Sequence, residues 1–346
     1  MNETPIASNT RERNTRVRNT VAESHSIMVE VEDTYAEAFR SLYCEFLITA
    51  RDRNWLDHAI SAATGHGSSS IMCDCEAGVD RYVGPGAATP DTPPLAADES
   101  FQTPDGRPGA ICQFHVPRFR KDRIRALEKS LLARVSQNVL TCPTARCFSV
   151  DQPAEDQDHY PLGRKVAFFG DRFEKIEHRF NRPMWVIPTM GGEFCIDQRF
   201  SYRDGIMGGN LWFLATSEDA SITAAEKAVE ACRQCPGVIT PFPGGIAASG
   251  SKAGSRYDFL FASTNDPFCP TLKNVEGVES QLPENVTSAM EIIINGSSLA
   301  AVHQATQASI KAACQVEGLV LITAGNYGGR LGKSWIWLKP ELHLES

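Results

Sequence analysis

The chain has 346 residues, of which 42% are hydrophobic, and a formal net charge of −8, so it can form one large domain or two medium ones. The acidic balance argues against nucleic acid and against an anionic membrane as the main partner. No apolar run approaches the ~18 residues of a membrane span, and the start of the chain lacks the apolar segment of a secretory signal, so we expect a cytoplasmic protein.

The first 26 residues lack apolar periodicity, which predicts a disordered N-terminal extension over residues 1–26. Beyond it, an apolar strand, a polar turn, an Ala-rich helix and a second strand recur four times. The expected strand, helix and strand of each unit span, in chain order, residues 45–50, 52–64 and 69–73; 110–116, 120–135 and 138–142; 210–216, 220–234 and 238–241; and 291–295, 298–314 and 319–323.

The spacing of apolar residues supports these helices. Ile222, Ala225, Val229 and Cys232 follow one another at i, i+3, i+7 and i+10, which places them on one narrow helical face. Glycines follow three of the expected helices, at the position where a helix C-cap favours glycine. Two such units in series form a split βαβ, or ferredoxin-like, sandwich. The sequence therefore predicts an α+β fold with two ferredoxin-like lobes.

We place the N-terminal lobe, labelled proximal, over residues 27–180 and the C-terminal lobe, labelled distal, over residues 181–346. Residues 84–102 are rich in Pro, Ala and Asp and have no period, which predicts a surface loop inserted into the first lobe. Between the lobes, residues 164–171 and 183–188 are expected to form strands on either side of a turn.

Glu291 is the candidate for acid–base chemistry. It opens the apolar run EIIIN, and a carboxyl group at the head of such a strand lies near poor solvent, which raises its pKa and favours the protonated form. A protonated carboxyl group can donate a hydrogen bond to a developing oxyanion and then exchange the proton. Taken without any resemblance to known proteins, the residue fits an exposed glutamate on an edge strand better than a catalytic acid.

Residues 31–39, VEDTYAEAF, bring acidic and hydroxyl groups together near the N-terminus. Thr34, Tyr35 and Glu37 are candidate substrate-binding residues. The alternative is structural, because Asp33 or Thr34 could cap a short helix whose first turn Glu37 would complement.

Polar residues also occur where expected strands end. Glu76 follows the run IMC, at a strand end that could face a ligand or simply form a turn. The segment TPDGRPG is typical of a turn, although its Arg107 could also pair with a substrate carboxylate. Residues 324–332, AGNYGGRLG, change from strand to glycines and supply Asn326 and Tyr327 as candidate binding residues.

The segment over residues 237–271 is the richest candidate for a binding site. Its glycines and serines allow a ligand to approach the backbone closely, and Lys252 lies among Ser249 and Ser251. A lysine in such a setting suits an anionic or carbonyl-bearing group.

The eleven cysteines do not have the spacing of a metal site. One C-x-x-C, Cys232–Cys235, stands without a second pair, and we expect reduced, mostly buried thiols and no bound metal. There is no G-x-S-x-G motif and no cysteine with an identifiable histidine base, so a transfer without a covalent enzyme intermediate fits better than nucleophilic catalysis.

Ten segments in order closely resemble the formylmethanofuran:tetrahydromethanopterin formyltransferase family. They extend over essentially the whole chain after the N-terminal extension. The segments are VEDTYAEAF, TGHGSSSIMCDCEAGVDR, TPDGRPG, NVLTCPT, GGEF, GIMGGN, TPFPGGIAASGSKAGSRYDF, ASTNDPFCP, EIIING and ITAGNYGGRLGK.

The resemblance implies transfer of a formyl group between formylmethanofuran and N5 of tetrahydromethanopterin, both acting as co-substrates, with no permanently bound cofactor. It also implies two ferredoxin-like lobes and a homotetramer whose substrate cleft lies at a subunit interface. Glu291 matches the family's proposed catalytic glutamate, and the other segments match its cleft walls.

Three features depart from the archaeal pattern of the family. They are the extension over residues 1–26, the loop over residues 84–102, and the cysteines at Cys75 and Cys142. CDCEAG and LTCPT are more similar to the versions in C1-metabolising bacteria, which implies possible subunits of a formyltransferase/hydrolase complex as partners. The alternative function is a non-catalytic subunit that binds the pterin or methanofuran within a larger complex.

Overall fold

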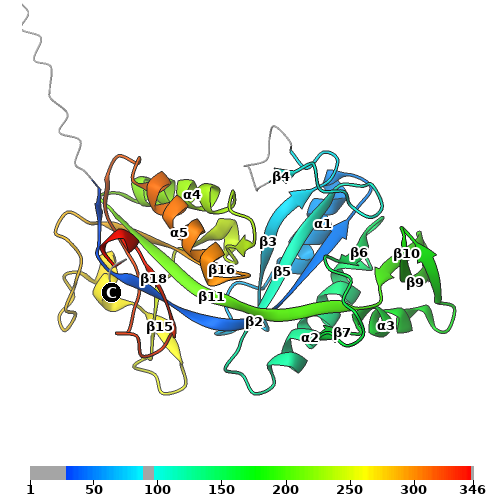
Figure 1. The fold of residues 1–346 in the computed structure, drawn as a ribbon. Coiled ribbons are helices and arrows are strands. Elements are labelled where there is room, and N and C mark those ends of the chain that lie inside the picture. Colours follow the sequence, from blue (N-terminus) through cyan, green and yellow to red (C-terminus); the bar gives the residue numbers. More distant parts are fainter. Residues whose placement is uncertain (1–28, 89–96, 344–346) are drawn as a thin grey trace, which may run out of the picture.

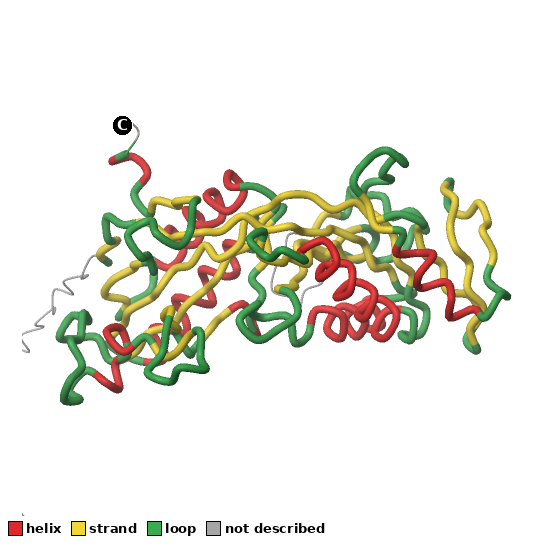
Figure 2. The backbone as a smooth tube through the Cα atoms, turned by 90° about the horizontal axis from the view of Figure 1, so that it is seen from below, coloured by secondary structure: helices red, strands yellow, loops and turns green. Residues whose placement is uncertain are grey.

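Two long antiparallel strands run through both halves of an elongated molecule (Figures 1 and 2). The computed structural model describes residues 29–88 and 97–343. Strand β2 (Tyr35–Thr49) and strand β11 (Phe200–Ala215) pair from Tyr202 opposite Cys44 to Met207 opposite Phe39. Each strand then continues into the sheet of one lobe, so that one sheet spans the molecule.

The N-terminal lobe has the ferredoxin-like order. Its strands lie in the order β3-β5-β2-β6, and each neighbouring pair is antiparallel. Both α1 and α2 cover one face of this sheet (Figure 1). The elements after β2 are α1 (Arg53–Thr64), β3 (Glu76–Val83), β5 (Gly109–Pro117), α2 (Arg123–Arg134) and β6 (Arg146–Ser149).

The C-terminal lobe repeats this arrangement. Its strands lie in the order β17-β11-β16, with β12 and β13 on the far side of β16, and every pair is antiparallel. The two lobes therefore confirm the predicted α+β fold with two ferredoxin-like units. The elements after β11 are α4 (Glu218–Cys232), β12 (Val238–Ile239), β13 (Ile246–Ala247), β16 (Ser288–Gly296), α5 (Leu299–Ala313) and β17 (Leu319–Thr323).

Shorter elements complete the sheet and its edges. A β8-β9-β10 meander extends the N-terminal lobe through β6, and β14 and β15 form a separate hairpin. The shorter strands and the short helix α3, in chain order, are β1 (Glu30–Val31), β4 (Ala97–Asp98), β7 (His159–Tyr160), α3 (Leu162–Ala167), β8 (Lys175–Arg179), β9 (Arg182–Thr189), β10 (Gly192–Asp197), β14 (Ser251–Ala253), β15 (Ala262–Thr264) and β18 (Ser334–Trp337).

Local sequence explains where the main helices begin. Asp52, Ser217 and Ser298 are N-caps whose side chains accept from the backbone N–H three residues later. The C-terminal end of α1 is closed by a side chain from α2, because Arg134 donates to the carbonyl groups of Ala63, Gly65 and His66.

Each lobe has its own hydrophobic core. In the N-terminal lobe Phe46 and Phe114 pack edge to face beneath the helices. The core of the C-terminal lobe includes Phe213 and also two residues from the start of β2, Ala36 and Ala38. The first residues of the described chain thus pack in the C-terminal lobe, since β1 pairs with β17 and β18 pairs with β2. The lobe boundary near residue 181 stays a prediction.

Three expected strands and one expected helix are not formed as predicted. Residues 69–73 form turns, and the strand begins only at Glu76, because the serine-rich run has no buried face. The apolar residues of 138–142 continue the helical period, since Val135 and Val139 are both buried, and a π-helical turn (Val135–Val139) extends α2.

Residues 164–171 belong to α3 and to a 3₁₀ turn (Phe168–Gly170) rather than to a strand. Phe168 and Phe169 lie in this turn, and each is 64% exposed, so they have no buried strand face. The helix proposed as the alternative for residues 31–39 does not form, because this segment is part of β1 and β2. Residues 1–26 and the central part of the loop over 84–102, residues 89–96, lie outside the described residues.

All eleven cysteines lie within the described residues, and none forms a disulfide. Seven of them are buried, as expected for small hydrophobic thiols. No helix among residues 29–88 and 97–343 is long and apolar enough to cross a membrane.

Cys112 in the middle of β5 tests this packing. Burial raises the pKa of its thiol, and Cys112→Ser should lower the free energy of unfolding by about 1–3 kcal/mol, because the hydroxyl group needs a partner that the core lacks. Chemical denaturation measures the change. Cys314→Ser, at a half-buried position after α5, is the control and should change stability by less than about 0.5 kcal/mol. Equal losses for the two variants would contradict this account.

Candidate active site

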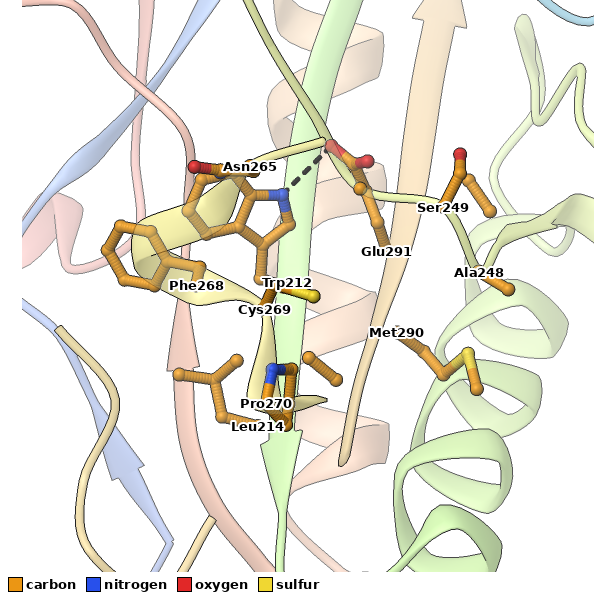
Figure 3. Close-up of a pocket in the computed structure, with 13 residues that line it drawn as sticks. Trp212, Leu214, Ala248, Ser249, Asn265, Phe268, Cys269, Pro270, Met290 and Glu291 are labelled. Atoms are coloured by element: carbon orange, nitrogen blue, oxygen red, sulfur yellow. Dashed lines mark hydrogen bonds between the residues drawn. The ribbon is translucent and has the colours of Figure 1, made fainter. Parts of the chain in front are cut away.

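Glu291 is buried on β16, with 7% of its surface exposed. It lies opposite Trp212 of β11, whose indole Nε1 donates to Oε1 of Glu291 at 2.9 Å (Figure 3). The Nδ2 group of Asn210 donates to the same oxygen at 3.0 Å. Burial raises the pKa of Glu291, and these two hydrogen bonds only partly oppose it. Burial therefore favours the protonated form of this carboxyl group, and the acid–base role of Glu291 stays a prediction.

A pocket opens beside this carboxyl group. It contains about 420 Å³ of space free of protein atoms, part of it open to solvent. Aromatic and apolar side chains form much of the wall, including Trp212, Phe268 and Met290 (Figure 3). Ser249, one of the predicted binding residues, lines the pocket, and its binding role stays a prediction. Asn265, which the sequence did not single out, lines it as well.

Ser251 and Lys252 lie on the β14–β15 hairpin next to the pocket. The ammonium group of Lys252 forms an ion pair with Asp266. Asp266 follows β15 and lies between Asn265 and Phe268, which both line the pocket. Lys252 is therefore paired in the described structure rather than presented as an isolated cation. Ser251 is exposed and faces Thr264 in the hairpin register.

Glu37 holds the glycine-rich loop over residues 325–332. Its Oε1 accepts from the backbone N–H groups of Tyr327 at 2.5 Å and Gly329 at 2.6 Å. Its Oε2 accepts from Leu331 at 3.0 Å and Gly332 at 2.8 Å. Burial alone would raise the pKa of Glu37, but these four donors outweigh it and lower the pKa. Glu37 thus stays ionised as the anchor of the loop.

The other candidate residues near the N-terminus contact the same loop. Asn326 donates to Oγ1 of Thr34 at 2.9 Å and to the backbone carbonyl of Tyr35 at 3.3 Å. The hydroxyl group of Tyr327 accepts from the backbone N–H of Ala253 on β14 at 2.8 Å. The structure therefore joins the loop to the hairpin that carries Ser251 and Lys252.

Asn210 connects this loop to Glu291. While its Nδ2 donates to Glu291, its Oδ1 accepts from the backbone N–H of Gly325 at 3.2 Å. Sequence reasoning recognised the strand NLWFLAT but missed Asn210 and Trp212 as site residues. The available signal was their spacing of two residues, which places both side chains on one face of a strand.

Glu76 is separate from the pocket and lies where the two lobes meet. Its carboxyl group accepts from Nδ2 of Asn295 on β16 at 2.6 Å, and from both the backbone N–H and the hydroxyl group of Ser70 at 3.0 Å. Burial raises the pKa of Glu76. Asp80 lies on the same strand and accepts from the backbone N–H of Gly237 at 2.8 Å. These contacts join β3 to the C-terminal lobe.

The turn that contains Arg107 is also used internally. Arg107 donates to Asp105 at 2.6 Å, and Arg146 donates to the same carboxylate at 3.0 Å. Arg107 thus has an intramolecular partner in place of a substrate carboxylate. Among the residues that the structure describes, no group of three or more His, Cys, Asp or Glu side chains is arranged to hold a metal ion.

Comparisons with known proteins place this geometry in a family. A profile described as formylmethanofuran-tetrahydromethanopterin formyltransferase matches residues 25–189, and one described as FTR, proximal lobe, matches residues 192–340. The formyltransferase of Methanopyrus kandleri is 43% identical over 318 residues, which cover 91% of this chain and 97% of that protein. The chain belongs to the formylmethanofuran–tetrahydromethanopterin formyltransferase family.

Solved structures agree with this assignment. The formyltransferase from Methanosarcina barkeri superposes with a TM-score of 0.79 at 40% identity, covering 90% of this chain and 97% of that chain. A structure of the formyltransferase/hydrolase complex (FhcABCD) from Methylorubrum extorquens, bound to methylofuran, matches with a TM-score of 0.78 at 38% identity, covering 91% and 97%.

Membership of the formyltransferase family confirms the predicted activity, and the non-catalytic binding subunit is not favoured. It also corrects one label. The family profile gives the name proximal lobe to residues 192–340, so the names proximal and distal that we assigned to the two lobes are reversed.

Glu37→Gln tests the anchor of the glycine-rich loop. The amide places a donor against backbone donors, so the free energy of unfolding should fall by about 2 kcal/mol. The lowered pKa gives the pH dependence: the contribution of Glu37 is present above the carboxyl pKa of the unfolded chain and is lost as the pH falls through the lowered pKa of the folded state.

Urea denaturation between pH 3 and 7 measures both effects. As the pH is lowered, the free energy of unfolding of the variant should fall less than that of the wild type. An equal fall in both proteins would contradict the assignment of Glu37 as an ionised anchor. Glu284→Gln, at an exposed position of the same lobe, serves as the control.

Proposed function

We propose that the protein transfers the formyl group by direct attack within a ternary complex, with Glu291 as the acid–base residue. The amine N5 of tetrahydromethanopterin attacks the formyl carbon of formylmethanofuran, and the carbonyl π electrons move to oxygen. The tetrahedral intermediate then expels the methanofuran amine, which takes up the proton lost by N5. The reverse reaction exchanges the roles of the two amines.

Glu291 would donate its proton, or a strong hydrogen bond, to the oxygen of the tetrahedral intermediate and recover that proton as the carbonyl group forms again. The observation that supports this role is a buried carboxyl group at the wall of a pocket, contacted by the neutral groups of Asn210 and Trp212. A cation in contact with Glu291 would instead favour the ionised form, which cannot donate.

The remaining candidate residues are proposed to bind and orient the two carriers. Ser249 lines the pocket, and Lys252 with Ser251 would lie against anionic parts of a carrier. Because Lys252 is paired with Asp266, such an anion would have to share the ammonium group with that carboxylate. Thr34, Tyr35, Glu37, Asn326 and Tyr327 would shape the neighbouring wall, and Glu76 would hold the lobes in register.

Glu291→Gln tests the acid–base role. Glutamine keeps the size and a hydrogen-bond donor but cannot give up a proton, so kcat should fall by about 10²-fold or more while KM changes little. Formyl transfer between the two purified carriers, followed optically, measures both constants. Turnover near that of the wild type would sink the acid–base role, and Glu284→Gln should remain fully active.

Methanofuran and tetrahydromethanopterin serve as substrates, and we propose that no other cofactor is permanently bound. We also propose a cytoplasmic location and a homotetramer with the cleft at a subunit interface. Exposed aromatic side chains between β14 and β15 support an interface here, because Tyr257, Phe259 and Phe261 are 65%, 76% and 88% exposed in the single chain. The likeness to FhcABCD supports hydrolase-complex subunits as further partners.

Salt dependence tests the homotetramer. With a net charge of −8 the subunits repel one another at low ionic strength, and salt screens this repulsion. Light scattering and formyl transfer should therefore show that particle mass and specific activity rise together as salt is added. A fully active monomer would contradict a cleft that needs two subunits.

A further inference from the structure

The hydrogen bonds of Glu291 are all on one of its two carboxyl oxygens. Trp212 and Asn210 both donate to Oε1, at 2.9 and 3.0 Å. In the described part of the chain, Oε2 has no hydrogen-bond partner, although Glu291 lines the pocket. Figure 3 shows the second oxygen on the side of the carboxyl group that is turned away from the Trp212 indole.

Neither donor can reverse its role. An indole N–H can only donate. An amide side chain can be turned so that it presents either oxygen or nitrogen, but Asn210 is held by the backbone N–H of Gly325, which also can only donate and which faces Oδ1 at 3.2 Å. The Nδ2 group of Asn210 must therefore face Glu291, so Oε1 receives two hydrogens and has no room for a third.

We propose that Asn210 and Trp212 are positioning residues that fix the proton of Glu291 on Oε2, the carboxyl oxygen without an intramolecular partner. The proton of the neutral acid is then directed away from the protein framework and is available to a substrate oxygen in the pocket. This inference rests on the acid–base role proposed for Glu291 and adds the atom from which the proton leaves.

The charged and titratable groups around Glu291 do not compete for this proton. They are the Lys252–Asp266 pair beside the pocket, Cys269 in its wall, and Glu32 and Glu37, which contact Thr323 and the loop over residues 325–332. Within the described residues none of these groups has a hydrogen bond or an ion pair with Glu291. The neutral donors alone thus decide which oxygen is protonated.

The same contacts couple the acid to the glycine-rich loop. Gly325 begins the loop that Glu37 holds, and its N–H fixes the orientation of Asn210. A shift of the loop that withdraws this N–H would free the Asn210 amide to turn. The placement of the proton therefore depends on a loop whose anchor lies on β2, far from Glu291 in the sequence.

Infrared spectroscopy can test the placement without measuring turnover. The difference between the wild type and Glu291→Gln isolates the carbonyl band of the protonated Glu291. A carbonyl oxygen that accepts two hydrogen bonds absorbs at a lower wavenumber than one that accepts a single bond. In Trp212→Phe, which keeps an aromatic ring but lacks the indole donor, we expect this band to move to a higher wavenumber.

Asn210→Asp tests the direction of the proton. The new carboxylate can still accept from the backbone N–H of Gly325, but its other oxygen places an acceptor against Oε1 of Glu291. The proton of Glu291 must then leave Oε2 and lie between Oε1 and the carboxylate oxygen at position 210. We expect kcat to fall about tenfold, which is the factor that one hydrogen bond of ordinary strength supplies, and we expect KM to change little. The added negative charge also raises the pKa of Glu291, so the basic limb of the pH–kcat profile should move to higher pH.

The control is Asn274→Asp, which adds the same charge at an exposed position of the same lobe and should leave the band, kcat and pH profile unchanged. A carbonyl band that stays in place in both Trp212→Phe and Asn210→Asp overturns the proposal, and Trp212→Phe alone decides if Asn210→Asp does not fold. If the band moves as expected while Glu291→Gln remains fully active, the proton placement stands and the proposed acid–base role fails.

Discussion

The antiparallel pairing of β2 with β11 is the contact on which the rest of the molecule depends. The C-terminal part of β2 pairs with β5 and β6 of the N-terminal lobe. The C-terminal part of β11 pairs with β16 and β17 of the C-terminal lobe. The pairing also requires a glycine. A Cβ atom at Gly205 would lie 2.8 Å from the Tyr43 ring and 2.9 Å from the carbonyl oxygen of Gly296. A continuous sheet thus positions both lobes and the site.

This shared sheet gives three buried glutamates different chemical characters. Glu37 receives four backbone N–H donors, and its pKa is lowered despite burial. Glu76 and Glu291 receive fewer donors, and burial raises the pKa of each. Donor number follows from position: Glu37 faces a loop with free backbone N–H groups, whereas Glu291 lies between paired strands whose N–H groups are already used. The proposed proton donor is therefore the glutamate that the backbone does not stabilise as an anion.

Sequence periodicity predicted the parts of the fold whose signal is local. The two ferredoxin-like units, the helices near 220–234 and 298–314, and the strand that contains Glu291 all follow from spacing and capping residues. The predicted start of that strand was wrong, because β16 begins at Ser288 and Glu291 lies inside it. The same reasoning failed at residues 138–142, where a short apolar run fits a strand as well as the end of a buried helix. Length and flanking residues were too weak to decide between them.

The candidate site was less accessible to sequence reasoning, because its contacts join residues far apart in the chain. Asn210 lies 81 residues from Glu291 and 115 from Gly325, and no local pattern states that one amide bridges both. Lys252 was expected to offer a positive charge, yet Asp266 neutralises it only 14 residues away. That pairing matters to the chemistry. Lys252 is matched by Asp266, and within the described residues no cation pairs with Glu291, so no contacting positive charge opposes the rise in the pKa of Glu291 that burial causes.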